Sequence, residues 1–475
     1  MMNRHRRGIV FVASASVAFV CSVVFYLCSD NVYSFLTFLD YFEDASSLQD
    51  SISDEGCIKI MSIGATEDQT KFNNNAILMT EWRVLVYKKG EDRPGAMYVA
   101  SGFNQKNNNS DNGISKSSSP STIIRTEDFV ANKLKVEKLP IINYPEKINF
   151  HPHGIYIRKE DRTLYVVNHA YEKGGERIDV FRIITDDDID IDDDIPIRLD
   201  YKYSITSDWM KKELNGIINS IVVVEENKFY ITQYEAEPHK PSPFKLSSEF
   251  KKGVTLLRNL LLGPDANTHV FYCEYTPLSS SASSSSALTD NLDCRKVADQ
   301  FEGANGITHN ADYSKIFVSS WKSITVFDRD STTNNLAGRI TIHVPNVVDN
   351  IKYDDVTGNI YGGTLNNMFS SFITNPYPKE SNKNVGGVVE LYQDGEHTSD
   401  AGDDFSWKAR QVITTSKLNS ISNGLRMNDY YVMGAGGLGY KGLLVCPVVD
   451  RTTMKGNSSD NDEDSTPVVQ QQSEL

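Results

Sequence analysis

Short segments of alternating apolar and polar residues recur along most of the chain, and turns rich in Asp, Asn and Lys separate them. Successive side chains of a β-strand point to opposite faces, so this alternation predicts strands paired as hairpins. The clearest hairpins span residues 154–170, 220–234, 306–330 and 350–365. Further strands are predicted at 178–183 and 386–394. Long amphipathic helices are scarce, and 247–263 is the best candidate.

The hairpins are repeats of one unit, in which a polar residue precedes a strand, a turn, a second strand and then a third. Sheets of three or four strands that repeat along a chain are typical of an all-β propeller. A β-sandwich is the structural alternative. Five segments are poor in large apolar residues, and we expect them to be solvated insertions or tails: 104–121, 186–194, 279–286, 394–404 and the end from about 455. The Asp-rich run at 186–194 lacks the glycine and closing glutamate of an EF-hand.

The N-terminus predicts a membrane anchor. Arg4, Arg6 and Arg7 precede residues 8–28, which contain no charged side chain and are long enough to span a bilayer as a helix. The positive-inside rule then keeps the first residues in the cytosol and places the rest on the lumenal or extracellular side. A cleaved signal peptide is the rival interpretation. We expect a basic stub and signal anchor at 1–30, a linker at 31–56, the folded domain at 57–450 and a disordered acidic tail at 451–475.

Composition and charge exclude one class of partner and raise the question of disulfides. The net charge is −15 without a concentrated basic stripe, which argues against a nucleic-acid partner. Cys57, Cys446, Cys273 and Cys294 lie on the predicted lumenal side, where four cysteines allow three disulfide pairings. Asn108 and Asn457 lie in glycosylation sequons.

Polar residues precede the predicted first strands at equivalent positions of the repeats. In a propeller these strands line the central channel, so their first residues should meet at one height. The set is Glu67, Asn219, Asn305, Asp349 and Asn350. Two carboxylates and three amides are hard oxygen donors, which suit calcium better than zinc or magnesium. The alternative is that Asn and Asp are simply favoured at turns and strand starts.

Two histidines accompany this set. His153 precedes one first strand, in "FHPHGI", and His169 ends the partner strand of the same hairpin, in "YVVNH". Antiparallel pairing would make them neighbours. A neutral imidazole beside a metal can take a proton from water while a second one orients it; two polar caps of a hairpin are the alternative.

The motifs "FHPHGI", "YVVNH", "EGANGI", "SITVFDRD" and "VVDNIKYDDVTGNIYGG", taken in this order, resemble the paraoxonase/arylesterase family. The resemblance covers about Cys57 to Cys446. It implies a six-bladed β-propeller behind an N-terminal transmembrane signal-anchor helix, and a disulfide between Cys57 and Cys446. It also implies a catalytic calcium held by the five oxygen donors above and a catalytic pair His153 and His169.

The resemblance further implies a second, structural calcium at Asp68, the main-chain carbonyl of Ile155 and residue 220. Here residue 220 is serine instead of the family's aspartate, which removes one negative ligand. The family often has an aromatic residue where this chain has Gly303, so the substrate pocket should differ.

The expected activity is calcium-dependent hydrolysis of carboxylic esters or lactones. The alternative is a catalytically weak, membrane-anchored propeller that acts as a chaperone or accessory subunit of another membrane protein.

Overall fold

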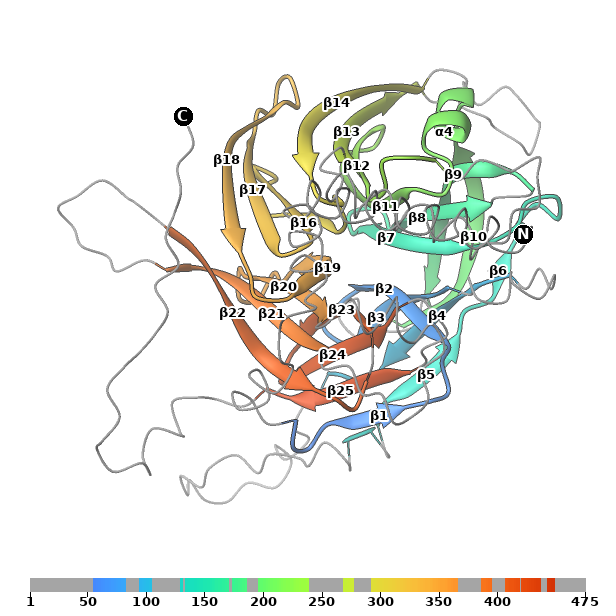
Figure 1. Ribbon diagram of the computed structural model, residues 1–475. Helices are drawn as coiled ribbons and strands as arrows, with labels where there is room; N and C mark the ends of the chain where they lie inside the picture. The colour runs from blue at the N-terminus through green and yellow to red at the C-terminus, as the bar shows by residue number, and fades with distance from the viewer. Residues whose placement is uncertain are drawn as a thin grey trace, which may run out of the picture.

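The computed structural model describes residues 54–82, 94–104, 129–130, 133–170, 173–185, 195–238, 268–276, 292–365, 386–394, 406–418, 420–436 and 442–448. Strands of these residues form five sheets around a common centre (Figure 1). The chain is therefore an all-β, propeller-like protein, as predicted, and not a sandwich of two sheets.

Four sheets have the four or five strands of a propeller blade. The first contains β2 (Ala65–Lys71), β3 (Ala76–Trp82), β4 (Ala96–Ser101) and β5 (Lys135–Lys138). The second contains β7 (Pro152–Arg158), β8 (Thr163–Ala170), β9 (Gly175–Thr185), β10 (Pro196–Ile205) and the short β6 (Ile141–Ile142). The third contains β11 (Ile218–Glu225), β12 (Lys228–Gln233), β13 (Thr268–Tyr275) and β14 (Leu292–Phe301). The fourth contains β15 (Ile307–His309), β16 (Lys315–Ser320), β17 (Ser323–Arg329) and β18 (Leu336–His343).

The remaining sheet has eight strands, so the described part of the chain has five sheets where the resemblance implied six separate blades. One half contains β19 (Val347–Tyr353), β20 (Ile360–Leu365), β21 (Gly386–Asp394) and β22 (Ser406–Thr415). The other half contains β23 (Ile421–Met427), β24 (Tyr430–Ala435), β25 (Leu443–Pro447) and β1 (Ile58–Ile60). A single parallel residue pair, Asn350 with Asn423, joins the halves.

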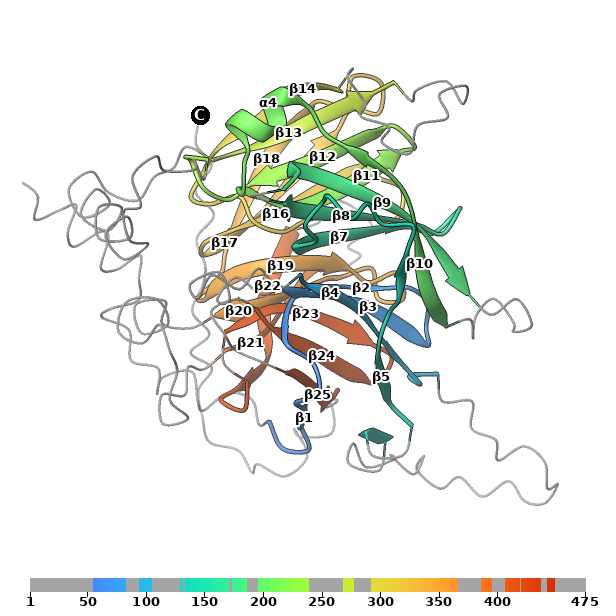
Figure 2. The same ribbon diagram turned by 90° about the vertical axis from the view of Figure 1, so that its right-hand side faces the viewer.

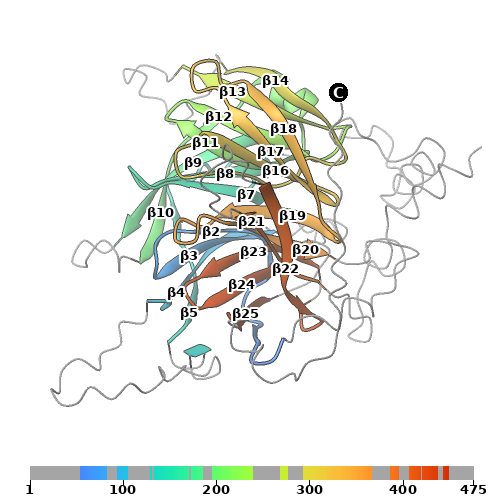
Figure 3. The same cartoon turned by 90° about the vertical axis from the view of Figure 1, so that its left-hand side faces the viewer.

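The hydrophobic cores lie between neighbouring sheets. One core packs β3 and β4 against β7, β8 and β9, and another packs β23, β24 and β25 back against β3 and β4, so that the ring closes. Sheets cover both faces of central strands such as β8, whose residues after Thr163 are all buried. The expected alternation of polar and apolar residues is therefore lost there. Outer strands such as β18, seen from outside in Figure 3, are mostly exposed.

A short helix between the second and third sheets interrupts this pattern. The described helix α4 (Asp208–Glu213) connects β10 to β11, and the side chain of Ser207 caps it by accepting a hydrogen bond from the Met210 N–H. The buried Met210 side chain anchors the helix in the core between the second and third sheets.

Several predicted features lie outside the described residues. These are the anchor at 1–30, the helix at 247–263, the acidic tail, and the sequons at Asn108 and Asn457. Among the residues that are described, no helix combines the length and apolar character needed to cross a bilayer.

A disulfide between Cys57 and Cys446 fastens the ring, as the resemblance implied. It lies next to the pairing of β1 with β25, which Figure 2 shows side by side. The first strand of the described chain thus completes the last sheet. A second disulfide joins Cys273 to Cys294, which face each other across β13 and β14. This settles the pairing that the sequence left open.

Removing the first disulfide should destabilise the domain more than removing the second, because its cysteines are 389 residues apart and the other two only 21. We expect a Cys57→Ala/Cys446→Ala variant to lose about 2–5 kcal/mol of unfolding free energy. A disulfide that closes a longer loop restricts the unfolded chain more. We therefore expect that loss to be about 2–3 kcal/mol larger than the loss in Cys273→Ala/Cys294→Ala, the matched control. Denaturant unfolding of both variants measures the difference, and equal losses would contradict the ring-fastening role.

Candidate functional site

The innermost strands are irregular at the places where the predicted site residues lie. Their pairing registers shift at 66–69 in β2, 152–155 in β7, 218–221 in β11, 348–351 in β19 and 421–423 in β23. A β-bulge removes a residue from the ladder and re-aims its side chain, which is why bulges occur beside active sites. These strands lie nearest the centre of the ring in Figure 1. The bulges therefore present side chains to the axis of the ring.

Gly154 and Gly306 are the glycines of the "HG" and "NG" pairs in the sequence, and both lie where two inner strands approach closely. A Cβ atom at Gly154 would lie 2.3 Å from the backbone oxygen of Asn219, and one at Gly306 would lie 2.9 Å from that of Asp349. Neighbouring inner strands approach too closely here for any side chain. The same approach brings Nδ1 of His153 within 3.0 Å of the Asn219 backbone oxygen.

Four members of the predicted calcium set share an unusual feature. Their side-chain Oδ1 atoms are buried and have no hydrogen-bond partner: Asn219, Asn305, Asp349 and Asn350. Buried polar atoms are normally hydrogen-bonded, and each exception costs about 1–3 kcal/mol. The fifth member, Glu67, is only 5% exposed. The structure thus keeps several hard oxygen donors desolvated.

The carboxylates repel one another. Burial, followed by the negative charges of Glu67 and then Asp68, raises the pKa of Asp349 well above its usual value, although a hydrogen bond from Asn305 acts in the opposite direction. Like charges in a buried place disfavour ionisation, and a bound cation would reverse this effect. The electrostatics therefore favour a positive ligand between these side chains.

The donor set fits calcium in its chemistry. It combines two carboxylates with three amide oxygens, and calcium takes six to eight oxygen ligands in flexible geometry. Within the described ranges, no group of three or more His, Cys, Asp or Glu side chains is arranged to hold a metal ion. An ion at the predicted site would therefore depend on amide oxygens for most of its side-chain ligands.

His153 lies at the edge of this set in a defined orientation. Because the Asn219 carbonyl accepts a hydrogen bond, Nδ1 carries the proton and Nε2 is the basic atom. Nε2 lies 3.5 Å from Oε1 of Glu67. Burial, and then the neighbouring His169, lower the pKa of His153 to about 3. The imidazole is therefore neutral at physiological pH.

His169 lies beside His153, with 4.8 Å between the ring centroids, so the predicted pair is indeed adjacent. Its Nδ1 lies 2.9 and 3.0 Å from the two carboxylate oxygens of Glu176. The N–H of Gly216 also donates to Glu176, at 2.7 Å. His169 and Glu176 are fully buried. A carboxylate thus fixes the orientation of the second imidazole.

Two aromatic residues border Gly303. Gly303 has a left-handed φ of 79°, and a Cβ there would lie 3.2 Å from the indole nitrogen of Trp321 and 3.3 Å from the Tyr234 carbonyl. The ring of Tyr234 stacks on His153 at a centroid distance of 6.0 Å. Trp321 and Tyr234 therefore place aromatic groups on this side of the site.

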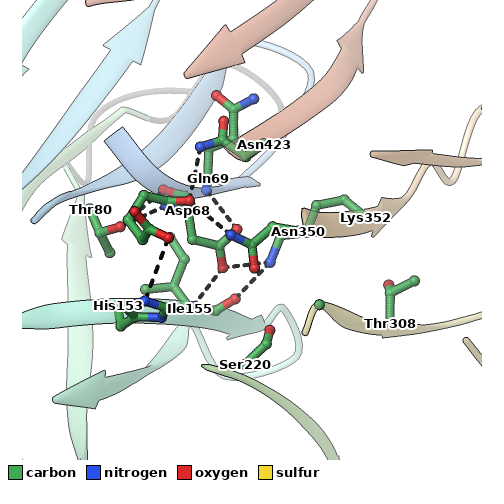
Figure 4. A network of polar contacts seen from close by, with 12 residues as sticks. Asp68, Gln69, Thr80, His153, Ile155, Ser220, Thr308, Asn350, Lys352 and Asn423 are labelled. Atoms are coloured by element: carbon green, nitrogen blue, oxygen red, sulfur yellow. Dashed lines mark hydrogen bonds and ion pairs between the residues drawn. The ribbon is translucent and has the colours of Figure 1, made fainter. Parts of the chain in front are cut away.

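The second predicted calcium set does not fit a metal ion. The ammonium of Lys352 lies 2.8 Å from Oδ2 of Asp68 and 3.1 Å from the carbonyl oxygen of Ile155 (Figure 4). The Ile155 N–H donates to the same Asp68 oxygen. Ser220, the third residue of the set, has a buried hydroxyl without a hydrogen-bond partner. A side-chain cation already neutralises Asp68.

Four residues that shape the site were not predicted from the sequence. Ser422 and Asn423 donate side-chain hydrogen bonds to the Glu67 carbonyl, each at 3.0 Å, and thereby hold the bulge of β2. They lie in "ISNGL", which repeats the Asn-Gly pair of "GANGI" and could have revealed them. Lys352 follows Asn350 by two residues, a strand spacing that also hints at a shared face. Glu176 has no sequence signal, because it faces His169 only through the register of β8 and β9.

No protein-family model matches the chain. Curated proteins with similar sequences include serum paraoxonase/lactonase 3 of Oryctolagus cuniculus, 25% identical over 246 residues that cover 51% of this chain and 56% of that protein. Serum paraoxonase/arylesterase 2 of Gallus gallus is 24% identical over 253 residues, 52% of this chain and 58% of the relative. The chain thus spans little more than half the length of these relatives.

Solved structures with a similar arrangement include the periplasmic gluconolactonase of Pseudomonas aeruginosa, with a TM-score of 0.39, 10% identity and coverage of 79% of this chain and 86% of that one. The PQQ domain of pyranose dehydrogenase from Coprinopsis cinerea has a TM-score of 0.42, 8% identity and coverage of 84% and 96%. Scores of this size assign no function. At low identity and over half its length, the chain is similar to curated proteins of the paraoxonase family.

Proposed function

We propose that the chain is a calcium-dependent hydrolase of carboxylic esters or lactones, of the arylesterase or lactonase type. Two observations carry the proposal. The side-chain oxygens of Asn219, Asn305, Asp349 and Asn350 are buried and unpartnered, and His153, which lies against Asn219 and Glu67, is adjacent to His169. A strand-start preference for Asn and Asp explains single positions. It does not explain why four such oxygens are left buried without a hydrogen-bond partner.

The chain's own residues supply the proton chemistry. A calcium ion held by the five donors would act as a Lewis acid toward a substrate carbonyl. His153 accepts the proton of an attacking water at Nε2, since its Nδ1 proton is committed to Asn219. The Glu67 carboxylate, 3.5 Å away, stabilises the imidazolium that results. After the acyl C–O bond breaks, the departing alkoxide takes up this proton.

His169 supports His153 and does not itself touch the substrate. Glu176 holds the Nδ1 proton of His169 between its two carboxylate oxygens, which fixes the tautomer and directs Nε2 away from Glu176. Glu176 is in turn held by the Gly216 N–H. The Glu176 carboxylate therefore determines the orientation of the His169 ring relative to the His153 ring.

The substrate class follows from the wall of the site. Tyr234 stacks on His153, and Trp321 borders Gly303, so the acyl or leaving group would meet aromatic surface. Aromatic rings bind aryl and alkyl groups through apolar contact. This favours an aryl ester or a lactone with an alkyl substituent over a strongly polar substrate.

The proposal includes the architecture and the location. The two halves of the eight-stranded sheet pack through a separate hydrophobic core, which contains Tyr361 and Val388 from one half and Met433 and Leu444 from the other. Counted as two blades, they complete a six-bladed propeller. We also retain the proposal that residues 1–30 anchor the protein as a single pass, with the propeller on the lumenal or extracellular side.

Calcium removal should abolish hydrolysis. We expect the purified full-length chain to hydrolyse phenyl acetate or an aliphatic lactone in calcium, to lose this activity in EGTA and to regain it when calcium is restored. An Asn305→Ala variant should fall to background, because it removes one oxygen ligand. Asn335→Ala, at an exposed amide, is the matched control and should keep full activity.

Full activity in EGTA would exclude the metal mechanism. If the calcium-loaded chain hydrolysed neither substrate and a membrane protein co-purified with it in stoichiometric amount, the accessory-subunit alternative would replace the hydrolase.

Glu176→Gln tests the positioning of His169. The amide keeps the size of the side chain but removes its charge and one of the two acceptors, so we expect kcat to fall about 10²-fold with little change in KM. The measurement is steady-state kinetics beside Glu226→Gln, a change at an exposed carboxylate. A change in KM with an unaltered kcat would show that Glu176 shapes the pocket instead.

A further inference from the structure

A lysine side chain lies among the buried acids at the centre of the ring. Lys352 belongs to β19 and follows Asn350, a predicted calcium ligand, by two residues. Its ammonium contacts two oxygens from two other sheets, Oδ2 of Asp68 on β2 and the carbonyl of Ile155 on β7. Figure 4 shows these groups close together beside Ser220. Three sheets therefore meet at one cation.

The two oxygens that Lys352 binds are those a metal ion at this place would need. Calcium–oxygen distances are about 2.3–2.6 Å, whereas Lys352 approaches the same oxygens at 2.8 and 3.1 Å, as an ammonium donor does. Two cations cannot share these positions. Residue 220 offers only a neutral hydroxyl, which is a weaker ligand than a carboxylate.

We infer that the Lys352 ammonium takes the place of a second metal ion, so that this chain binds a single calcium at its centre. The inference deepens the proposed function and rests on it for the first calcium. A covalently attached cation here performs a structural task, which is to tie β2, β7 and β19 together at the axis.

The test is a metal count with a matched pair of variants. A Lys352→Ser/Ser220→Asp variant removes the ammonium and adds a carboxylate, and we expect it to bind one more calcium per chain than the wild type. The control is Lys202→Ser, which removes an exposed ammonium paired with Asp200. Full-length proteins dialysed against calcium and counted by plasma mass spectrometry give the numbers, and their melting temperatures give a second readout. In the double variant, calcium should raise the melting temperature more than in the wild type.

The outcomes separate the two proposals. A difference of one ion supports the role of Lys352, and no difference overturns it, whatever the wild-type count. A wild-type count of one supports the calcium of the proposed function, and zero contradicts that calcium without changing the comparison between variants. If the double variant fails to fold, calorimetric titration of the wild type decides. One binding step supports the inference, and two independent steps refute it.

Discussion

Acidic and amide side chains from strands that are remote in sequence are buried near the axis of the ring, and the rest of the site depends on them. Four of their oxygens make no hydrogen bond. At about 1–3 kcal/mol each, such groups weaken the fold by an amount comparable to a large part of a domain's net stability. A cation would recover this energy through direct ligation. An ion bound at the proposed site would therefore stabilise the fold, which would link the fold to the proposed chemistry.

Asn219 connects the proposed ligands to the proposed base. Its backbone carbonyl accepts the Nδ1 proton of His153, while its side-chain oxygen belongs to the unpartnered set. Both atoms lie in the bulge of β11, and Gly154 permits the close approach of β7 that brings His153 there. The positions of the proposed proton acceptor and of one proposed ligand are consequently both fixed by Asn219. A shift of β11 would disturb both positions, so β7 and β11 function as one element.

Features that depend on residues close in the sequence could be predicted from it. Features that depend on the pairing of strands far apart in the sequence could not. The hairpins and the contact of His153 with His169 followed from strand periodicity and the repeat, and the meeting of Asn219, Asn305 and Asp349 around an ion stays a prediction. Glu176 did not, because its contact with His169 needs the register of the next strand. The eight-stranded sheet was missed since one parallel pair at Asn350 joins its halves. The strand β8 was predicted, but alternation did not reveal that its residues after Thr163 are all buried, because other sheets cover both of its faces.

A tethered ammonium and a free metal ion stabilise a buried carboxylate in different ways. An ion is lost by dilution or chelation, and its stabilising effect varies with its concentration. The ammonium of Lys352 remains at Asp68 at any calcium level, because the chain itself holds it there. The junction of β2, β7 and β19 is thereby independent of the ion that Glu67 and Asp349 would bind. A ring closed by the Cys57–Cys446 disulfide and tied at its axis by a lysine can keep its shape while the proposed catalytic ion exchanges.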